Sequence, residues 1–206
     1  LVADIEVRDN IEITQMITKF NELAVRDGFT KLYNKTFINN ELESLVQAAR
    51  GGSPAGEAAV VLLDIDGFKQ INDTYGHIAG DDALQYFASK MRSFSRSFDG
   101  WVGRFGGDEF VLCFTNQDDI ANIENISMDI INELYEGYTT ADGAMHIDVK
   151  ASIGVAFCPE HTEDVNELLS FADTAMYFVK KNGKTNYHIY IPEDSATDEY
   201  IDPEGF

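Results

Sequence analysis

Two pairs of acidic residues stand where they could bind a divalent cation. Asp64 and Asp66 flank Ile65 at the end of an apolar run, and Asp108 and Glu109 follow two glycines. A hard cation such as magnesium takes several oxygen ligands that converge from different segments. Two such pairs therefore favour a magnesium site of the kind that accompanies a nucleotide. Acidic residues at strand ends are often only solvated, but the apolar runs that lead into both pairs place them at the rim of a core.

A polar segment with several glycines follows the first acidic pair. It runs from Phe68 to His77 and continues to Gly80 and Asp81. Taken as a turn-rich loop, it can offer backbone N–H groups and the ammonium of Lys69 to phosphates; the alternative is an ordinary surface loop. Its glycine pattern excludes a Walker A loop, because no Gly-Lys-Ser/Thr follows, and it also differs from the dinucleotide-binding fingerprint.

The elements that must position these residues alternate between strands and helices. Continuous apolar residues over 58–65 predict a strand buried on both faces. Trp101 and Val102, the glycines Gly106 and Gly107, and residues 109–114 predict a hairpin with its turn at the glycines. Apolar spacing predicts helices over 38–49, 84–94, 120–134 and 165–179, and strands over 147–157 and 187–191. This order predicts an α/β fold with a mixed central sheet and flanking helices.

Segments at both ends of the chain are expected to lie outside that fold. Six apolar residues at helical spacing predict an amphipathic helix that ends near Asp27: Ile13, Met16, Ile17, Phe20, Leu23 and Ala24. It is either a coiled-coil signalling helix or a helix that docks on the domain. The tail over 192–206 is acidic and lacks Lys and Arg. We therefore predict a linker helix over 1–26, a catalytic domain over 27–191 and a tail over 192–206. Because the chain starts at Leu1, it is expected to be part of a longer protein.

Composition narrows the class of partner. The 206 residues are 44% hydrophobic, which suits one compact domain. The formal net charge of −21 argues against nucleic acid or an anionic membrane surface as partner, so a polyanionic substrate would need local positive charge. No apolar run approaches the roughly 18 residues of a spanning helix. Cys113 and Cys158 match no metal or redox spacing, which favours two buried reduced thiols and a cytosolic compartment.

Together, these motifs resemble the GGDEF-domain diguanylate cyclase family. Residues 106–110 read GGDEF, residues 63–77 read LDIDGFKQINDTYGH, and residues 80–81 read GD. Three further pieces follow the family's order: DGFTKLYN over 27–34, SIGV over 152–155, and AD over 172–173 with KKNG over 180–183. The resemblance extends over about 27–191, far longer than a chance match to one pentapeptide.

The resemblance implies a role for each matching residue. The metal would be bound by Asp64, the main-chain carbonyl of Ile65, Asp108 and Glu109. That metal would be magnesium, with manganese as the alternative. Guanine would be held by Asn72 and Asp81, with His77 in the same site. Phosphate contacts are implied for the backbone near Phe68 and Lys69 and for the side chains of Lys69, Lys180 and Lys184. Gly106 and Gly107 would let the nucleotide approach the backbone closely.

The implied activity is the condensation of two GTP molecules into cyclic di-GMP with release of pyrophosphate. One 3′-hydroxyl attacks the other α-phosphate, and the catalytic residues would be Asp108 and Glu109, with Asp108 as the candidate to help remove the proton. The sequence leaves open which of the two takes which role, and direct activation of the hydroxyl by the metal is the alternative. Each domain of the family binds one GTP, so a homodimer is expected, and an upstream sensory domain is expected to regulate it. The implied fold is palm-like, with a ferredoxin-like core similar to class III nucleotide cyclases. We expect a cytoplasmic domain, within a full-length protein that can itself be membrane-attached.

The chain departs from the family pattern in two places. Ser97 and Gly100 stand where many members carry the Arg and Asp of an inhibitory product site, although Arg96 and Asp99 have the right types one residue earlier and could form a displaced site. Lys184 stands where arginine is usual, and lysine lacks the bidentate fork. The main alternative function is a catalytically silent domain that binds GTP or cyclic di-GMP as a receptor. A relative that makes a mixed GMP-AMP dinucleotide is expected to carry a small polar residue at this position, whereas this chain has Asp81.

Overall fold

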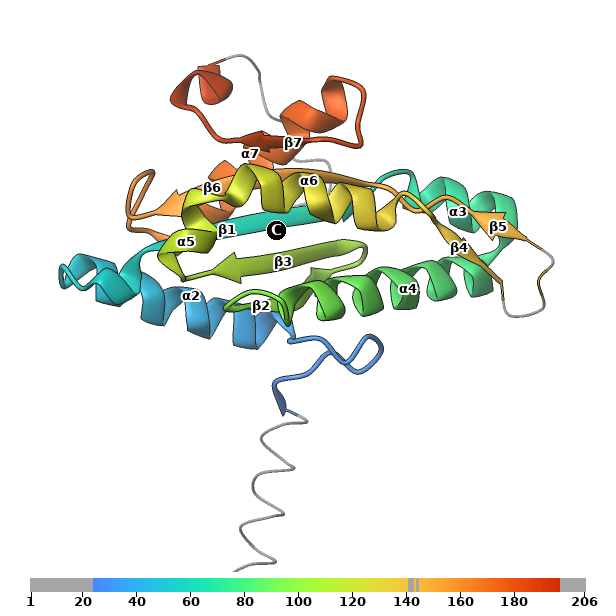
Figure 1. Cartoon of the computed structure of the whole chain (residues 1–206), viewed down its shortest axis with the longest axis horizontal. Helices are drawn as coiled ribbons and strands as arrows, with labels where there is room; N and C mark the ends of the chain where they lie inside the picture. Colours follow the sequence, from blue (N-terminus) through green and yellow to red (C-terminus); the bar gives the residue numbers. More distant parts are fainter. Residues whose placement is uncertain (1–23, 141–142, 144, 197–206) are drawn as a thin grey trace, which may run out of the picture.

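A central sheet of five strands organises the protein. A computed structural model describes residues 24–140, 143 and 145–196, and its strands lie in the order β2-β3-β1-β6-β7 (Figure 1). They are β1 (Ala58–Ile65), β2 (Gly100–Gly106), β3 (Glu109–Phe114), β6 (Ala151–Cys158) and β7 (Tyr187–Ile189). β1 is antiparallel to both β3 and β6, whereas β7 is parallel to β6. The predicted mixed sheet is therefore confirmed.

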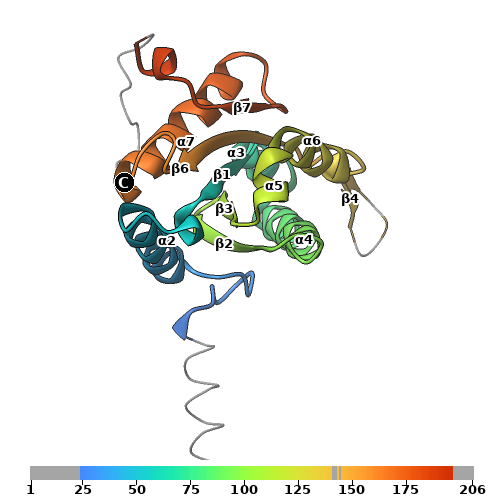
Figure 2. The same ribbon diagram turned by 60° about the vertical axis from the view of Figure 1, so that its left-hand side comes forward.

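Both faces of the sheet are covered by helices, which explains the unbroken apolar run over residues 58–63 of β1. Alternate residues of a strand point to opposite faces, so every position must be apolar when both faces are buried. Ala59, Val61 and Leu63 pack in the core with α4 (His77–Ser95) and α6 (Ile123–Leu134). The intervening residues of β1 pack with α2 (Lys35–Arg50) and α7 (Val165–Lys181), on the other side of the sheet (Figure 2). Each fully buried Val or Leu contributes roughly 1.5–3 kcal/mol.

Helix α7 has an acidic N-cap at one end and two lysines at the other. Asp164 is the N-cap, and its carboxylate accepts from the N–H groups of Asn166 and Glu167 at 2.9 and 3.2 Å. Lys180 and Lys181 lie in the last turn, where a positive charge interacts favourably with the helix dipole. α7 contacts both β1 and β6, and its last turn reaches the end of β1 that carries Asp64.

The segment after β1 differs from the prediction. We expected a turn-rich loop over 68–77, but the structure has α3 (Phe68–Tyr75) there, followed at once by α4. Gly67 and Gly76 have φ values of 69° and 86° and separate the three elements. Ile71 is buried in the core, so one apolar side chain anchors a segment whose other residues are mostly polar. The glycines are therefore helix boundaries rather than parts of a continuous loop.

Two other elements are divided where the sequence predicted one. The helix predicted over 120–134 is α5 (Gln117–Ala121) and α6, which meet at Asn122. The strand predicted over 147–157 is β5 (His146–Ile147) followed by β6, and β5 pairs with the unpredicted β4 (Tyr138–Thr139) as a separate ribbon. In both cases, a short irregular stretch separates residues whose apolar pattern is continuous.

The ends of the described region only partly match expectation. The predicted N-terminal helix lies almost wholly in residues 1–23, outside the described residues. The structure adds two short 3-10 helices, η1 (Pro54–Gly56) and η2 (Pro192–Ala196). η2 shows that the first residues of the acidic tail are part of the fold, because the carboxylate of Asp194 lies 3.0 Å from Nε2 of His188. No helix in the described ranges is both long and apolar enough to cross a membrane.

Candidate active site

The carboxyl end of β1 brings acidic and basic side chains together. In the sheet register, Asp64 stands opposite Glu109 on β3 and Ser152 on β6. Directly opposed residues on neighbouring strands have Cβ atoms about 4.5–5.5 Å apart, so the Asp64 and Glu109 side chains are close neighbours. The ammonium of Lys180, from the last turn of α7, lies 2.9 Å from Oδ2 of Asp64. Three elements far apart in sequence therefore meet at one point.

The carboxylates at this point are held at unusual pKa values. Burial raises the pKa of Asp64 to about 6, although Lys180 counteracts the rise. Burial also raises the pKa of Glu109 to about 7, and the charges of Asp64 and Asp173 add to the effect. One lysine thus does not balance the negative charge gathered there, which favours a further cation beside these groups.

The donor set fits a hard divalent cation. The predicted ligands Asp64, Asp108 and Glu109, together with the carbonyl of Ile65, are oxygen donors on adjoining chain ends, and Ile65 N–H donates to the carbonyl of Asp108 at 3.3 Å. Across the described ranges, no three His, Cys, Asp or Glu side chains are grouped tightly enough to hold an ion. In this arrangement Lys180 supplies the positive charge at Asp64. The residues that would hold a cation are therefore two carboxylates on adjoining strands, Asp64 and Glu109, with Asp108 and the Ile65 carbonyl beside them.

A cavity of about 540 Å³ opens beside the acidic point. Most of the predicted substrate and metal residues line it, and so does Asp66 of the first acidic pair. Gly67 and Asp73 also line it, although neither was predicted as a site residue. The predicted residues in its lining are Asp64, Ile65, Phe68, Lys69, Asn72, His77, Asp108, Lys180 and Lys184. The structure thus brings together the acidic pairs and the basic residues that lie more than 100 positions apart in the sequence.

The first turn of α3 faces this cavity and can bind an anion there. The N-cap residue Gly67 has no side chain to accept from the first N–H groups of the helix, and the first helical bond runs from Ile71 N–H to the Gly67 carbonyl. The N–H groups of Phe68 and Lys69 precede that bond, and both residues line the cavity. Helix N-termini attract phosphate through such N–H groups and through the helix dipole.

The two predicted guanine ligands lie on adjacent helices. Asn72 on α3 lines the cavity, and a Cβ on Gly80 of α4 would lie 1.9 Å from Oδ1 of Asn72. The glycine therefore gives room to the Asn72 amide. Asp81, the next residue on α4, is exposed and does not line the cavity. The helix contact brings the Asp81 backbone near Asn72 but leaves the guanine-binding role of Asp81 a prediction.

The double-glycine turn is braced by an arginine that we did not predict as a site residue. Arg104 on β2 donates from Nε to the carbonyl of Gly107 at 2.9 Å and lies 3.4 Å from the carboxylate of Asp27. Gly107 has φ of 31° and nothing within 4 Å of an added Cβ, whereas a Cβ on Gly106 would lie 3.9 Å from Glu109. The turn is thus open on its outer side, so a ligand can approach its backbone.

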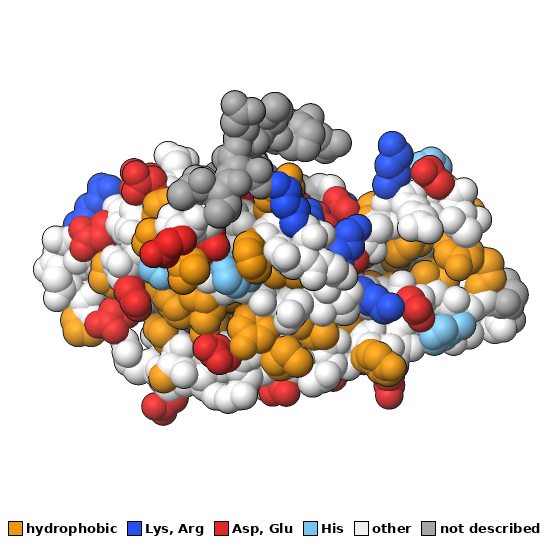
Figure 3. Space-filling model, turned by 90° about the horizontal axis from the view of Figure 1, so that it is seen from above, with side chains coloured by type: hydrophobic (Ala, Val, Ile, Leu, Met, Phe, Trp, Pro, Cys, Tyr) orange, Lys and Arg blue, Asp and Glu red, His pale blue; other side chains and the backbone are white. Residues whose placement is uncertain are grey.

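Positive charge gathers locally on this strongly acidic protein. The space-filling view of the face that carries β7 shows several Lys and Arg side chains from the centre to the right, with Asp and Glu side chains among them (Figure 3). Lys69, Lys180 and Lys184 all line the site cavity. These side chains supply the local cations that a triphosphate needs on a chain with a net charge of −21.

The two residues of the predicted displaced inhibitory site lie elsewhere. Arg96 is the C-cap of α4, and Asp99 precedes β2 at the end opposite Gly106. The Asp99 N–H donates to the carboxylate of Asp119 at 3.2 Å. Arg96 and Asp99 are therefore remote from the catalytic cavity, as a separate product site would be, and that role remains a prediction.

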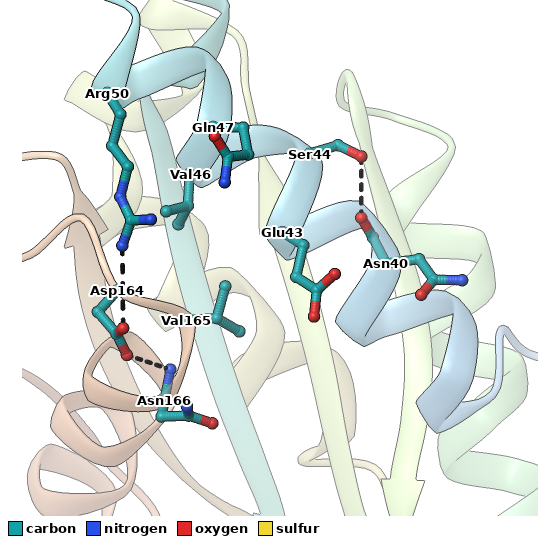
Figure 4. A pocket seen from close by; sticks show the side chains of 9 residues that line it. All are labelled: Asn40, Glu43, Ser44, Val46, Gln47, Arg50, Asp164, Val165 and Asn166. Carbon is teal, nitrogen blue, oxygen red and sulfur yellow. Dashed lines mark hydrogen bonds and ion pairs between the residues drawn. The ribbon is translucent and has the colours of Figure 1, made fainter.

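A larger cavity lies away from the acidic point. Its volume is about 670 Å³, and it separates α2 from the start of α7 (Figure 4). Arg50 reaches across it to Asp164 at 3.9 Å and also donates to the carbonyl of Glu163 at 2.9 Å. Its lining contains no predicted site residue. Size alone therefore does not locate the chemistry, whereas the grouping of carboxylates and lysines does.

Two acidic residues near the site, Asp173 and Asp66, have roles that their sequence motifs did not indicate. Asp173 on α7 is buried, and its charge raises the pKa of Glu109. Asp66 was expected to share the cation with Asp64, but its carboxylate is bound by the protein itself. Asp173 lies in the AD pair and Asp66 in the acidic run, so both belonged to quoted motifs. Their partners become visible only in the fold.

Comparison with known proteins places most of the chain in one family. Residues 24–186 match the family described as "Diguanylate cyclase, GGDEF domain". The response regulator PleD of Caulobacter vibrioides is 36% identical over 167 residues, which cover 79% of this chain and 35% of PleD. The bifunctional diguanylate cyclase/cyclic di-GMP phosphodiesterase MucR of Pseudomonas aeruginosa is 32% identical over 190 residues, or 91% of this chain and 27% of MucR. The chain thus spans about a third or less of these curated relatives.

A solved structure agrees with the sequence comparison. The GGDEF domain of TpbB (YfiN) from Pseudomonas aeruginosa superposes with a TM-score of 0.76 at 31% identity, covering 83% of this chain and 97% of that one. The shared architecture includes the mixed sheet and its flanking helices.

Proposed function

Because the chain belongs to the GGDEF domain family, we propose that it is a diguanylate cyclase that joins two GTP molecules into cyclic di-GMP. One observation carries the proposal. Asp64, Asp108 and the lysines of α3 and α7 meet at a single cavity, with Glu109 on the adjoining strand. A metal-bound triphosphate needs this combination of oxygen donors and cations.

The proposed reaction forms two phosphodiester bonds. The 3′-hydroxyl oxygen of one GTP attacks the α-phosphorus of the other, the bond to the β-phosphate oxygen breaks, and pyrophosphate leaves. A second, equivalent step closes the ring. A bound magnesium ion would neutralise charge on the phosphate oxygens. Asp64, Glu109 and the Ile65 carbonyl would hold that ion, and Asp108, which lines the cavity, is the candidate to accept the hydroxyl proton.

The remaining residues position the nucleotide. The first turn of α3 and Lys69, Lys180 and Lys184 would bind the triphosphate, and Asn72 would pair with the guanine edge, assisted by Asp81 and His77. On binding, Lys180 would exchange its contact with Asp64 for phosphate oxygens, since both lie at the same cavity. Most of the catalytic effect would come from placing the attacking oxygen in line with the α-phosphate.

Catalysis requires two copies of this domain. Asn72, the three lysines and Asp64 line a single cavity, so we expect one domain to hold one GTP. The attacking and attacked nucleotides must then come from facing domains of a homodimer. An upstream sensory domain would control how these domains meet, consistent with the fraction of the relatives' length that the chain spans. We also propose a cytoplasmic location for the domain; the free buried thiols of Cys113 and Cys158 are compatible with a reducing compartment.

A receptor without catalysis is the second candidate function. Lys180 is paired with Asp64, and three acidic side chains are not yet grouped for metal in the described residues. A domain fixed in that arrangement would bind a guanine nucleotide through α3 and the lysines but would not activate it.

Pyrophosphate release at several protein concentrations separates the two candidates. We expect the specific activity of the full chain with GTP and magnesium to rise with protein concentration, because a dimer carries the reaction. The specific activity should be lower at every protein concentration in Lys180→Met, which lacks a phosphate ligand. Release that is undetectable at every concentration, while GTP still binds, would favour the receptor.

A further inference from the structure

Both carboxylate oxygens of Asp66, which also lines the cavity, accept hydrogen bonds from the protein. Oδ1 accepts from the hydroxyl of Ser152 on β6 at 2.6 Å. Oδ2 accepts from the backbone N–H of Thr185 at 2.9 Å and from its hydroxyl at 3.1 Å. The N–H of Asp66 donates to the carbonyl of Lys150 at 2.9 Å. Asp66 therefore ties together the end of β1, the end of β6 and the segment that follows α7.

The segment after α7 adopts a backbone that needs such support. Lys184 and Thr185 have φ values of 63° and 51°, in the left-handed region that residues with a Cβ rarely adopt. The Lys184 N–H donates to the carbonyl of Val179 at 3.0 Å, and the next anchor is the carbonyl of Asn186, which accepts from Ile153 at 3.0 Å. Between these two anchors, Thr185 is held by Asp66.

This backbone carries a lysine of the site. Lys184 lines the same cavity as Asp64, Lys69 and Lys180, and Thr185 is its neighbour in the chain. The conformation at Thr185 thus fixes the point from which the Lys184 side chain extends. A lysine has four flexible methylene groups, so its ammonium is directed mainly by where its backbone starts.

We propose that Asp66 is a positioning residue for the triphosphate, acting through Thr185 to hold Lys184 at the phosphate end of the cavity. The inference rests on the proposed binding of GTP. The two residues of the first acidic pair would then have different roles. Asp64 is paired with Lys180 and would bind the cation, whereas Asp66 holds the backbone at Thr185. Three of the roughly four acceptor positions of the Asp66 carboxylate are already taken by Ser152 and Thr185, which favours a structural role over a metal-ligand role.

A double-mutant cycle with Lys184 tests this assignment. The dissociation constant of the α,β-methylene analogue of GTP, which cannot release pyrophosphate, is measured by calorimetry with the full chain and magnesium. Asp66→Asn should raise it about tenfold, the effect of losing one hydrogen bond to a charged group. In the Lys184→Ala background, the same change should add less than about twofold, because the two residues act on one contact. Equal factors in both backgrounds would mean a general structural role and would overturn the proposal.

Two further variants keep the test decisive. Thr185→Ala removes only the hydroxyl donor, so a rise of about threefold is expected, again lost with Lys184→Ala; an unchanged constant contradicts the assignment even if Asp66→Asn folds poorly. Asp148→Asn makes the same charge change at a side chain that is 66% exposed, and its constant should stay within about twofold of wild type. A wild type that does not bind the analogue refutes the proposed function. A wild type that binds it as tightly as Asp66→Asn refutes the positioning role alone.

Discussion

Replacing Asp64 with asparagine should stabilise the metal-free protein at alkaline pH. Burial raises the Asp64 pKa from an ordinary 3.8 to about 6 in the folded state. The folded protein therefore holds this proton to higher pH than the unfolded chain, and the free energy of unfolding falls as pH rises from about 4 to about 6. About two pKa units correspond to about 3 kcal/mol. Asparagine stays neutral, so Asp64→Asn should gain about 3 kcal/mol over wild type at pH 8 and less than about 1 kcal/mol at pH 4.

Urea denaturation with a chelator at pH 4 and pH 8 measures this difference. Asp148→Asn is the matched control, because its side chain is 66% exposed, and its free energy of unfolding should stay within about 0.5 kcal/mol of wild type at both pH values. Added magnesium should then reduce the difference in free energy of unfolding between Asp64→Asn and wild type at pH 8, because it binds the folded wild type more tightly than the variant. A wild type as stable as Asp64→Asn at pH 8, or a gap that is the same at both pH values, would refute the reasoning.

Three other substitutions test separate contacts. Gly80→Ala places a methyl 1.9 Å from the Asn72 side-chain oxygen, so the KM for GTP should rise about tenfold. In an Asn72→Ala background the same change should cause no further rise in KM, and an additive rise would contradict the contact. Arg104→Ala removes the hydrogen bond to the Gly107 carbonyl and should lower the free energy of unfolding, measured in urea, by about 2 kcal/mol. If Arg104→Lys were as stable as wild type, the planar guanidinium would not be needed at this position. Gly154→Ala places a methyl 2.0 Å from a backbone oxygen of α7 and should cost about 3 kcal/mol in the same assay, so a neutral result would mean that the helix can move away.

The sheet was predictable because its central strand is buried on both faces. The continuous apolar residues over 58–63 predict a strand buried on both faces, and the structure places this strand between two layers of helices. α3 was not predictable in the same way. Only Ile71 of its eight residues is buried, so its helical pattern is too weak to separate from a loop with glycines at both ends. Two-residue strands such as β4 leave no pattern at all.

The residues of the site were predictable by type, but their partners were not. The acidic pairs and the lysines of the cavity all belong to motifs visible in the sequence, and the fold brings them to one point. The partners of a carboxylate depend on contacts across more than 80 residues, as for Asp66, which lines the cavity and is also hydrogen-bonded to Ser152 and Thr185. Asp81 shows the same limit, since its motif predicts a guanine contact while the side chain lies outside the cavity lining.

The most direct test of the central claim is the identity of the product. The purified chain is incubated with GTP and magnesium at high protein concentration, and the nucleotides are separated by chromatography, beside a variant with Asp108→Ala and Glu109→Ala combined. We predict cyclic di-GMP and two pyrophosphates per product from the wild type and neither from the variant. A wild type that binds GTP but yields no cyclic di-GMP, or a variant that yields as much as wild type, would contradict a cyclase built on this acidic centre.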